Sequence, residues 1–179
     1  MTSVQITQMA RPGIAPSSLE HGDIARRIPH QHSMCLLDRV TTWDTQRISC
    51  EADSHHSPDN PMRSHGRLGS ACGIEYAAQA MAVHGALIAE SLGASATGGA
   101  QARGGYLVSV RSVTLFAVQL DTVAGRLTVT AERVSGDANT VLYSFTVLDG
   151  VKSLLTGRAI VVLNPQDVAT GPVAARIPA

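Results

Sequence analysis

The longest apolar stretch of the sequence lies between Gly69 and Gly93 and has the composition of a helix. It is rich in Ala, Leu, Ile and Met, which favour helix formation, and it ends at a glycine, which commonly terminates helices. Ser70 is the expected N-cap. Glu75 and Glu90 are the formally charged residues inside this stretch. A helix that is apolar on nearly every side should be buried over most of its surface.

Alternating apolar and polar positions predict strands on both sides of this helix. Short turn-like joints at 136–139 and 149–151 indicate that the last three strands form an antiparallel meander. Two strands, one buried helix and four strands predict an α+β fold, in which a curved antiparallel sheet wraps around one long helix. The expected strands are Met34–Val40, Arg47–Asp53, Tyr106–Phe116, Arg126–Val134, Thr140–Asp149 and Ser153–Leu163.

The length of 179 residues suits a single domain. Residues 1–20 and 164–179 lack periodicity and are rich in turn-forming residue types, which predicts flexible tails around one domain at 21–163. Because a small sheet with long edge strands needs its edges covered, we expect a homodimer or a higher assembly.

Charge and composition exclude several classes of protein. Lys and Arg number 14 and so do Asp and Glu, so the basic excess typical of nucleic-acid binding is missing. No run of 18 apolar residues is free of charge and no secretory signal is visible, so we expect a cytoplasmic protein without a membrane span. Cys35, Cys50 and Cys72 have no metal-site or disulfide spacing, and we expect small buried hydrophobes there and no metal or other cofactor.

Glu75 is the most informative single residue of the sequence. It lies in the first turns of the apolar helix, where partial burial favours a protonated carboxyl group that can act as a general acid. The positive end of the helix dipole acts in the opposite direction. Gln79 lies one turn further along the same face and could orient this carboxyl group. The alternative is a solvated glutamate that only complements the dipole.

A histidine-rich segment precedes the helix and could supply a general base. His55, His56 and His65 are the candidates, although each on its own also suits a polar surface loop. Metal binding by His55, His56 and Asp59 is disfavoured, because adjacent histidines tend to point apart. His84, in the middle of the helix, is predicted to be a packed core histidine.

The backbone at the start of the helix is the third candidate feature. Its N–H groups could polarise the carbonyl oxygen of a thioester. Small side chains there would let a ligand approach, and they would equally allow close packing of the helix against the sheet. The residues concerned are Ser70, Ala71, Cys72 and Gly73.

Two blocks of the sequence resemble the 3-hydroxyacyl-acyl-carrier-protein dehydratases of the hotdog fold. The first is PHQHSMCLLDRV (Pro29–Val40), which is similar to the opening strand of that family, and the second is GIEYAAQAM (Gly73–Met81), which carries its E-x-x-AQ helix pattern. The run GRLGSACGIEYAAQA is closer still to a dehydratase-like subgroup found with aryl polyene and related polyketide-type pathways. The resemblance covers about residues 22–163 and implies a hotdog fold.

The resemblance also implies roles for individual residues. Glu75 takes the place of the carboxyl group that protonates the departing 3-hydroxyl. The GHFPGHP loop that carries the base in the family is not present: Pro61 stands at the catalytic histidine and His65 at the second histidine. His65 is therefore the first candidate for the base, with His55 and His56 as alternatives. His30 matches a family position and is interpreted as structural, holding the start of the opening strand.

The reaction that the resemblance implies is dehydration of a 3-hydroxyacyl thioester to a trans-2-enoyl thioester in fatty-acid, polyketide or aryl polyene-type biosynthesis. The acyl group would be carried by an acyl carrier protein or by coenzyme A. Two alternatives stay open: a hotdog acyl thioesterase, and a non-catalytic acyl-binding subunit that forms a heterodimer with another hotdog subunit.

Overall fold

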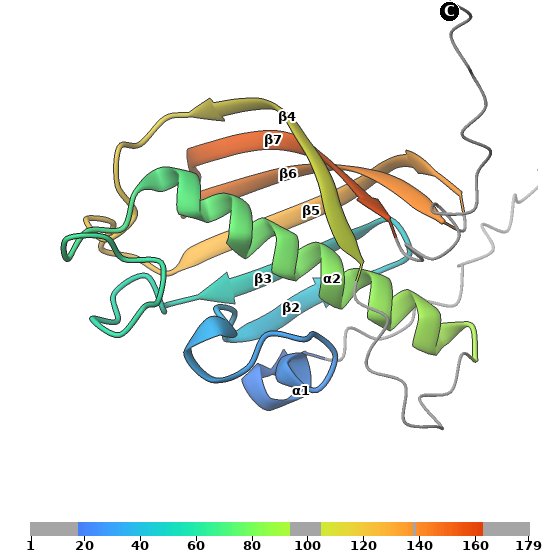
Figure 1. Ribbon diagram of the computed structural model, residues 1–179. Helices are drawn as coiled ribbons and strands as arrows, with labels where there is room; N and C mark the ends of the chain where they lie inside the picture. Colours follow the sequence, from blue (N-terminus) through green and yellow to red (C-terminus); the bar gives the residue numbers. More distant parts are fainter. Residues whose placement is uncertain (1–17, 94–104, 138, 163–179) are drawn as a thin grey trace, which may run out of the picture.

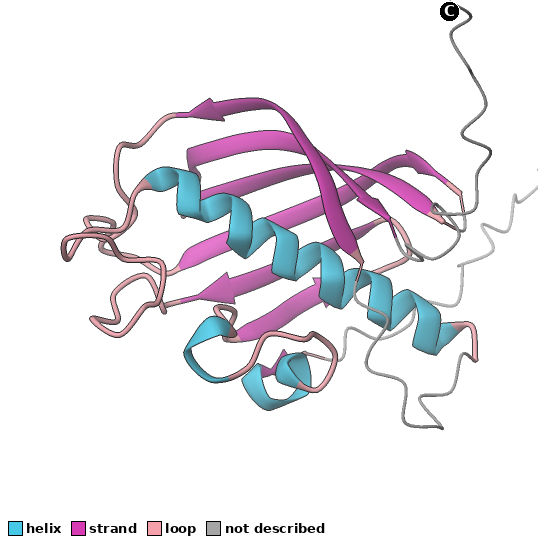
Figure 2. Cartoon of the chain, in the orientation of Figure 1, coloured by secondary structure: helices cyan, strands magenta, loops and turns pink. Residues whose placement is uncertain are grey.

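A single sheet of seven antiparallel strands and one long helix make up most of the structure. The computed structural model describes residues 18–93, 105–137 and 139–162. Helix α2 (Gly73–Ser91) runs across the concave face of the sheet (Figure 1), and the strands (magenta) curve around it (Figure 2). The strand order is β1-β2-β3-β5-β6-β7-β4, which confirms the predicted sheet around one helix. The strands are β1 (Leu19–Glu20), β2 (Arg39–Trp43), β3 (Arg47–Ala52), β4 (Tyr106–Leu115), β5 (Leu127–Gly136), β6 (Thr140–Asp149) and β7 (Lys152–Val162).

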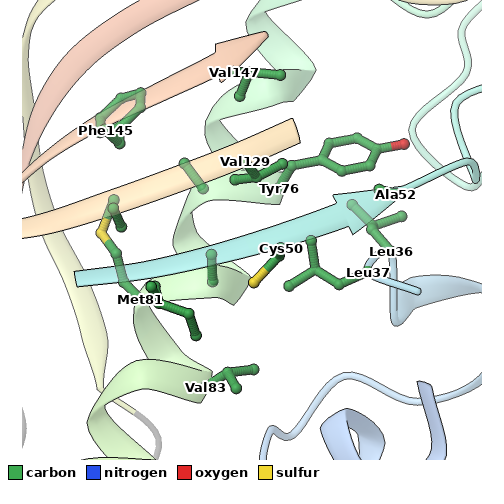
Figure 3. Packing of buried hydrophobic residues seen from close by; sticks show 14 of the residues in the cluster. Leu36, Leu37, Cys50, Ala52, Tyr76, Met81, Val83, Val129, Phe145 and Val147 are labelled. Atoms are coloured by element: carbon green, nitrogen blue, oxygen red, sulfur yellow. The ribbon is translucent and has the colours of Figure 1, made fainter. Parts of the chain in front are cut away.

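The core lies between α2 and the inner face of the sheet. Period-two alternation in β6 buries every second side chain, from Val141 to Val147, and β5 follows the same rule. Figure 3 shows the side chains of Tyr76 and Met81 on α2 beside those of β3 and β5. Both residues are buried in this core. No helix within the described ranges is long and apolar enough to cross a membrane.

The helix begins differently from the sequence prediction. A 3₁₀ turn, η2 (Ser70–Cys72), precedes α2, and the predicted N-cap role of Ser70 is wrong. Ser70 is buried, and its N–H donates to the carbonyl of Val118 at 3.0 Å. Gly73 then brings the helix against β7, because a Cβ atom at this position would lie 2.1 Å from Cδ2 of Leu155.

The predicted opening strand Met34–Val40 is also corrected. Met34 closes a 3₁₀ turn, η1 (His32–Met34), and β2 begins only at Arg39. The apolar residues between them are buried without forming a strand. The N–H of Leu36 donates to the side chain of Gln79 instead of to a neighbouring strand.

The N-terminal part of the described chain adds two elements that hydrophobic periodicity did not indicate. Leu19 and Glu20, within the predicted tail, pair with Val40 and Arg39 of β2, and helix α1 (His21–Ala25) follows directly. These elements are too short to produce a period of their own. Residues 1–17 of the predicted N-terminal tail lie outside the described residues, as do Leu163 at the end of the last predicted strand and the predicted tail 164–179.

His84 is buried in the core, as predicted, and both of its ring nitrogens have partners. Nε2 lies 2.7 Å from the carbonyl oxygen of Asp44 and Nδ1 lies 3.0 Å from the hydroxyl of Tyr143. Nε2 must donate to the carbonyl, so Nδ1 accepts from the hydroxyl. The pair ties the middle of α2 to the β2–β3 turn and to β6, and burial raises the pKa of Tyr143 to about 12.

Replacing Gly73 by Ala should destabilise the protein, because the added methyl group would overlap the side chain of Leu155. We expect the free energy of unfolding to fall by about 1–3 kcal/mol. Chemical denaturation measures this change. Gly69→Ala is the matched control, since a Cβ atom at Gly69 meets no atom within 4 Å and its φ of −65° suits alanine. Equal stabilities of the two variants would contradict this packing.

Burial of His84 should make the protein less stable in acid. Desolvation lowers the pKa of His84 in the folded chain below its ordinary value of 6.5. The unfolded chain therefore binds a proton at His84 at higher pH, and this contribution to the free energy of unfolding is lost as the pH falls below about 6.5. Denaturation measured from about pH 7.5 to about 5.5 should show a weaker pH dependence in His84→Gln than in the wild type. An identical dependence would count against this assignment.

Candidate active site

Glu75 lies in the first turn of α2, with its side chain 27% exposed. One carboxylate oxygen, Oε1, has two nitrogen neighbours: Nε2 of Gln79 at 3.0 Å and Nε2 of His30 at 3.1 Å. His30 comes from the segment between α1 and η1, far from Glu75 in sequence. Oε1 is therefore held from two sides by groups of different segments.

Gln79 is fully buried, and its whole amide group is used. Its Oε1 accepts the N–H of Leu36 at 2.8 Å. Its Nε2 donates to the carbonyl of Met34 at 2.8 Å and to Glu75. The same side chain thus anchors the segment before β2 to the helix and contacts the carboxylate one turn away.

A cavity of about 910 Å³ lies beside this carboxylate. Glu75 and His30 both line it, together with Ala78 and Ala82, which follow Glu75 on one face of α2. Further lining residues come from the segment 25–31, from Tyr106 and Leu107 at the start of β4, and from Val161 on β7. The small alanine side chains leave room beside a single carboxylate in a mostly apolar wall.

The hydroxyl of Tyr76 joins the loop after β3 to the helix. It accepts from Nδ2 of Asn60 at 3.0 Å and lies 2.9 Å from Oγ of Ser54. Ser54 donates to the carbonyl of Leu36 at 2.7 Å, so the tyrosine donates to Ser54. Every member of this network has a partner. The network fixes the start of α2, and with it the backbone that carries Glu75.

His55 and His56 lie in a tight turn after β3, and the expectation that they point apart is wrong. Their ring centroids are 3.8 Å apart, and Nε2 of each approaches the carbonyl of Val123, at 3.3 Å for His55 and 2.7 Å for His56. The chain turns at this point instead of continuing as a strand, because the N–H of His56 donates to the carbonyl of Asp53. Burial lowers the pKa of His55, which keeps its ring neutral.

The acidic neighbour of these two rings is Asp53 and not Asp59, the acidic residue named with them in the disfavoured metal site. The donor atoms of Asp53, His55 and His56 lie within 4.8 Å of one another. Oδ1 of Asp53 is 2.9 Å from Nδ1 of His56. Both ring nitrogens of His56 therefore have hydrogen-bond partners within the protein, and we assign no metal here.

His65 lies at the tip of an exposed turn in which Ser64 and Arg67 pair with each other. Its φ of 52° places it in the left-handed region, and its Nδ1 lies 3.0 Å from Oγ of Ser64. The described residues that line the cavity beside Glu75 do not include His65. The structure of one chain thus brings His30, and not His65, to the carboxylate.

The N–H groups before α2 are largely engaged within the chain. Ser70 donates to Val118, Cys72 donates to Gly69, and Gly73 donates to the carbonyl of Ser70. Ala71 is the exposed residue of the four. Gly73 serves the close packing of helix and sheet, which is one of the two alternatives, whereas the exposed backbone at Ala71 leaves the other alternative a prediction.

The three cysteines have the environment of small hydrophobes. Cys35 and Cys50 are buried and Cys72 is half-buried. Burial raises the pKa of all three thiols, that of Cys50 to about 12. None of them is a thiolate at neutral pH, so nucleophilic cysteine chemistry is disfavoured.

The sequence as a whole matches a protein-family model. The model of the ApeP-like family, described as ApeP dehydratase, matches residues 22–171, which include every residue of the site. The chain belongs to the ApeP-like dehydratase family. This confirms the resemblance to hotdog dehydratases of the aryl polyene type. No curated protein is similar enough in sequence to be matched.

Solved structures show the fold that this chain shares. The dehydratase heterocomplex ApeI:P from Xenorhabdus doucetiae contains a chain that is 19% identical, with a TM-score of 0.69 over 83% of this chain and 97% of that chain. The uncharacterized protein PH1136 from Pyrococcus horikoshii is 11% identical, with a TM-score of 0.52 over 78% and 92% of the two chains. The ApeP-like chain has the hotdog fold, as predicted.

His30 is the residue of the site that sequence reasoning missed. It matches the dehydratase pattern and was expected to hold the start of a strand, but no strand begins there and its ring contacts Glu75. The match of Pro29 and His30 to the family was the one signal in the sequence. It could not show that this segment folds back onto the helix.

Proposed function

We propose that this ApeP-like dehydratase removes water from a 3-hydroxyacyl thioester, carried by an acyl carrier protein or by coenzyme A, to form a trans-2-enoyl thioester. One observation carries the proposal: the carboxyl group of Glu75 lines a cavity of about 910 Å³ whose other walls are mostly apolar. An acyl chain needs such walls, and the reaction needs one acid beside them. Membership in a dehydratase family supports this reaction, within fatty-acid, polyketide or aryl polyene-type biosynthesis.

In the proposed reaction, a base removes the proton from C2 of the substrate. The electrons of that C–H bond form the C2=C3 double bond while the C3–O bond breaks. Oε2 of Glu75, the oxygen that His30 and Gln79 do not hold, gives its proton to the departing oxygen, and water leaves. No metal or other cofactor takes part in this proposal.

For the base, we retain His65 as the first candidate, with His55 and His56 as the alternatives. His65 is exposed at a turn tip, whereas His55 is fully buried and His56 is bonded at both ring nitrogens. Since His65 does not line the cavity of its own chain, it would act on the substrate of a neighbouring subunit. The oxygen of the thioester would be held by the backbone near Ala71, the exposed residue of the helix start.

Strand β4 supports an assembly of hotdog subunits. Among the described strands it is a sheet edge that pairs only with β7, and most of its side chains are exposed. A long apolar edge of this kind is a site for pairing with another chain. Because Tyr106 and Leu107 also line the cavity, a subunit at β4 would lie next to the substrate. We propose a homodimer, a higher assembly or a pair with a second hotdog subunit, and a cytoplasmic location stays a prediction.

Replacing Glu75 by Gln should abolish dehydration, because the amide cannot supply the proton. We expect kcat to fall by about 10²–10⁴-fold. The assay follows a 3-hydroxyacyl carrier-protein thioester, and in parallel the coenzyme A thioester, by intact mass, where dehydration removes the mass of one water. Glu90→Gln, at the exposed far end of the same helix, is the matched control.

Two results would contradict this role. Equal activity of Glu75→Gln and the wild type would remove the carboxyl group from the reaction. Release of free carrier protein by the wild type would favour the thioesterase alternative. The assay is run on the chain alone and on the assembly in which it is purified, so that a non-catalytic subunit is recognised by activity that depends on its partner.

Replacing Val108 by Glu should weaken the assembly. Val108 is 57% exposed on β4 and does not line the cavity, so the change buries an unpaired charge at the proposed interface. We expect the dissociation constant to rise by about tenfold or more, measured by light scattering across a dilution series. Val151→Glu, in the fully exposed β6–β7 turn, should leave it unchanged. An unchanged assembly in Val108→Glu would exclude β4 as the interface.

A further inference from the structure

The two nitrogen atoms at Oε1 of Glu75 have distinct origins, and the hydrogen bonds around them determine which atoms carry protons. The N–H of Leu36 needs an acceptor, and Oε1 of Gln79 at 2.8 Å is that acceptor. The opposite end of the amide is therefore the NH₂ group, which donates to Glu75. Oε1 of Glu75 is thus an acceptor whatever the state of the carboxyl group.

The proton of His30 can be placed in the same way. Its Nδ1 atom is inaccessible to solvent and has no hydrogen-bond partner among the described residues. A buried N–H without an acceptor is costlier and rarer than a buried lone pair without a donor. The neutral ring therefore carries its proton on Nε2, which donates to Oε1 of Glu75 across 3.1 Å.

The backbone around His30 is held on both sides. Before it, Ile28 is buried in the core and Pro29 restricts the backbone. After it, the side chain of Gln31 donates back to the carbonyls of Ala25 at 2.8 Å and Ile28 at 3.2 Å. Since Gln79 fixes the following residues through the carbonyl of Met34, the imidazole is placed at the carboxylate with little freedom.

We propose that His30 is a positioning residue for the dehydration, an inference that rests on the function proposed above. Its Nε2–H, together with the amide of Gln79, holds Oε1 of Glu75 and turns Oε2 toward the cavity. When Oε2 gives its proton to the departing hydroxyl, negative charge develops on the carboxylate. Hydrogen bonds to a charged group are stronger than those to a neutral one, so both donors then act more strongly.

His30 is not the base in this arrangement. Its Nδ1 is sealed from the cavity, and its Nε2 already carries a proton directed at Glu75. The C2 proton of the substrate therefore goes to another group. As a hydrogen-bond donor to Glu75, His30 should respond to substitution differently from a histidine that accepts the proton of the substrate.

The test compares three variants of the full chain in the assembly that is active. Gln at position 30 places an amide nitrogen four bonds from Cα, as Nε2 is in histidine, whereas Asn places it where Nδ1 was. We expect His30→Gln to keep kcat within about threefold of the wild type. His30→Asn and His30→Leu should lose about 10–100-fold in kcat with little change in KM, because the hydrogen bond acts on charge that develops in the transition state.

Nitrogen NMR of the histidine side chains is the second readout and does not require activity. We expect His30 of the wild type to give the signature of the neutral Nε2–H tautomer, and Glu75→Gln to shift that signal. Melting curves of the three variants show whether each one is folded.

Three results would overturn the inference: a His30→Gln variant as inactive as His30→Leu, a folded His30→Leu variant with wild-type kcat, or the Nδ1–H tautomer in the NMR spectrum. Failure of the proposed function looks different, since Glu75→Gln would then dehydrate the substrate as fast as the wild type does.

Discussion

One buried amide group, that of Gln79, connects the fold of this protein to its candidate site. Its oxygen holds the N–H of Leu36 and its nitrogen holds the carbonyl of Met34 and the carboxylate of Glu75. A buried amide that lost one of these partners would leave another polar group unpaired in the core, which is costly. The segment before β2, the helix α2 and the orientation of the acid are therefore determined together.

The pattern of residue types was sufficient to predict most of the strands. The bounds of β6 agree with the prediction, and those of β4, β5 and β7 differ from it by two residues or fewer. Periodicity failed where side chains, and not strand ladders, satisfy the backbone. Residues 34–37 are apolar like a strand, yet the side chain of Gln79 bonds the N–H of Leu36 and the carbonyl of Met34. The N-cap prediction for Ser70 failed for a different reason, because this residue lies in a 3₁₀ turn and its N–H donates to the backbone carbonyl of Val118.

The site was only partly predictable for a related reason. The position of Glu75 on an apolar helix and the i, i+4 spacing of Gln79 are properties of one helix, and the sequence contains them. The contact of His30 with Glu75 depends on how a separate segment folds back, which no local pattern encodes. The carboxyl group of Glu75 therefore reaches the cavity where three segments of the chain are joined by hydrogen bonds. The start of the exposed edge strand β4 forms part of the cavity wall.

The most direct test of the role of Glu75 is a crystal structure of the active assembly with a non-reactive 3-hydroxyacyl pantetheine thioester analogue. We expect the 3-hydroxyl oxygen to lie within hydrogen-bond distance of Oε2 of Glu75, about 2.5–3.0 Å, with the acyl chain along Ala78 and Ala82. An analogue bound with its hydroxyl away from Glu75, or an acyl chain outside this cavity, would contradict the central claim that this carboxyl group acts on the substrate.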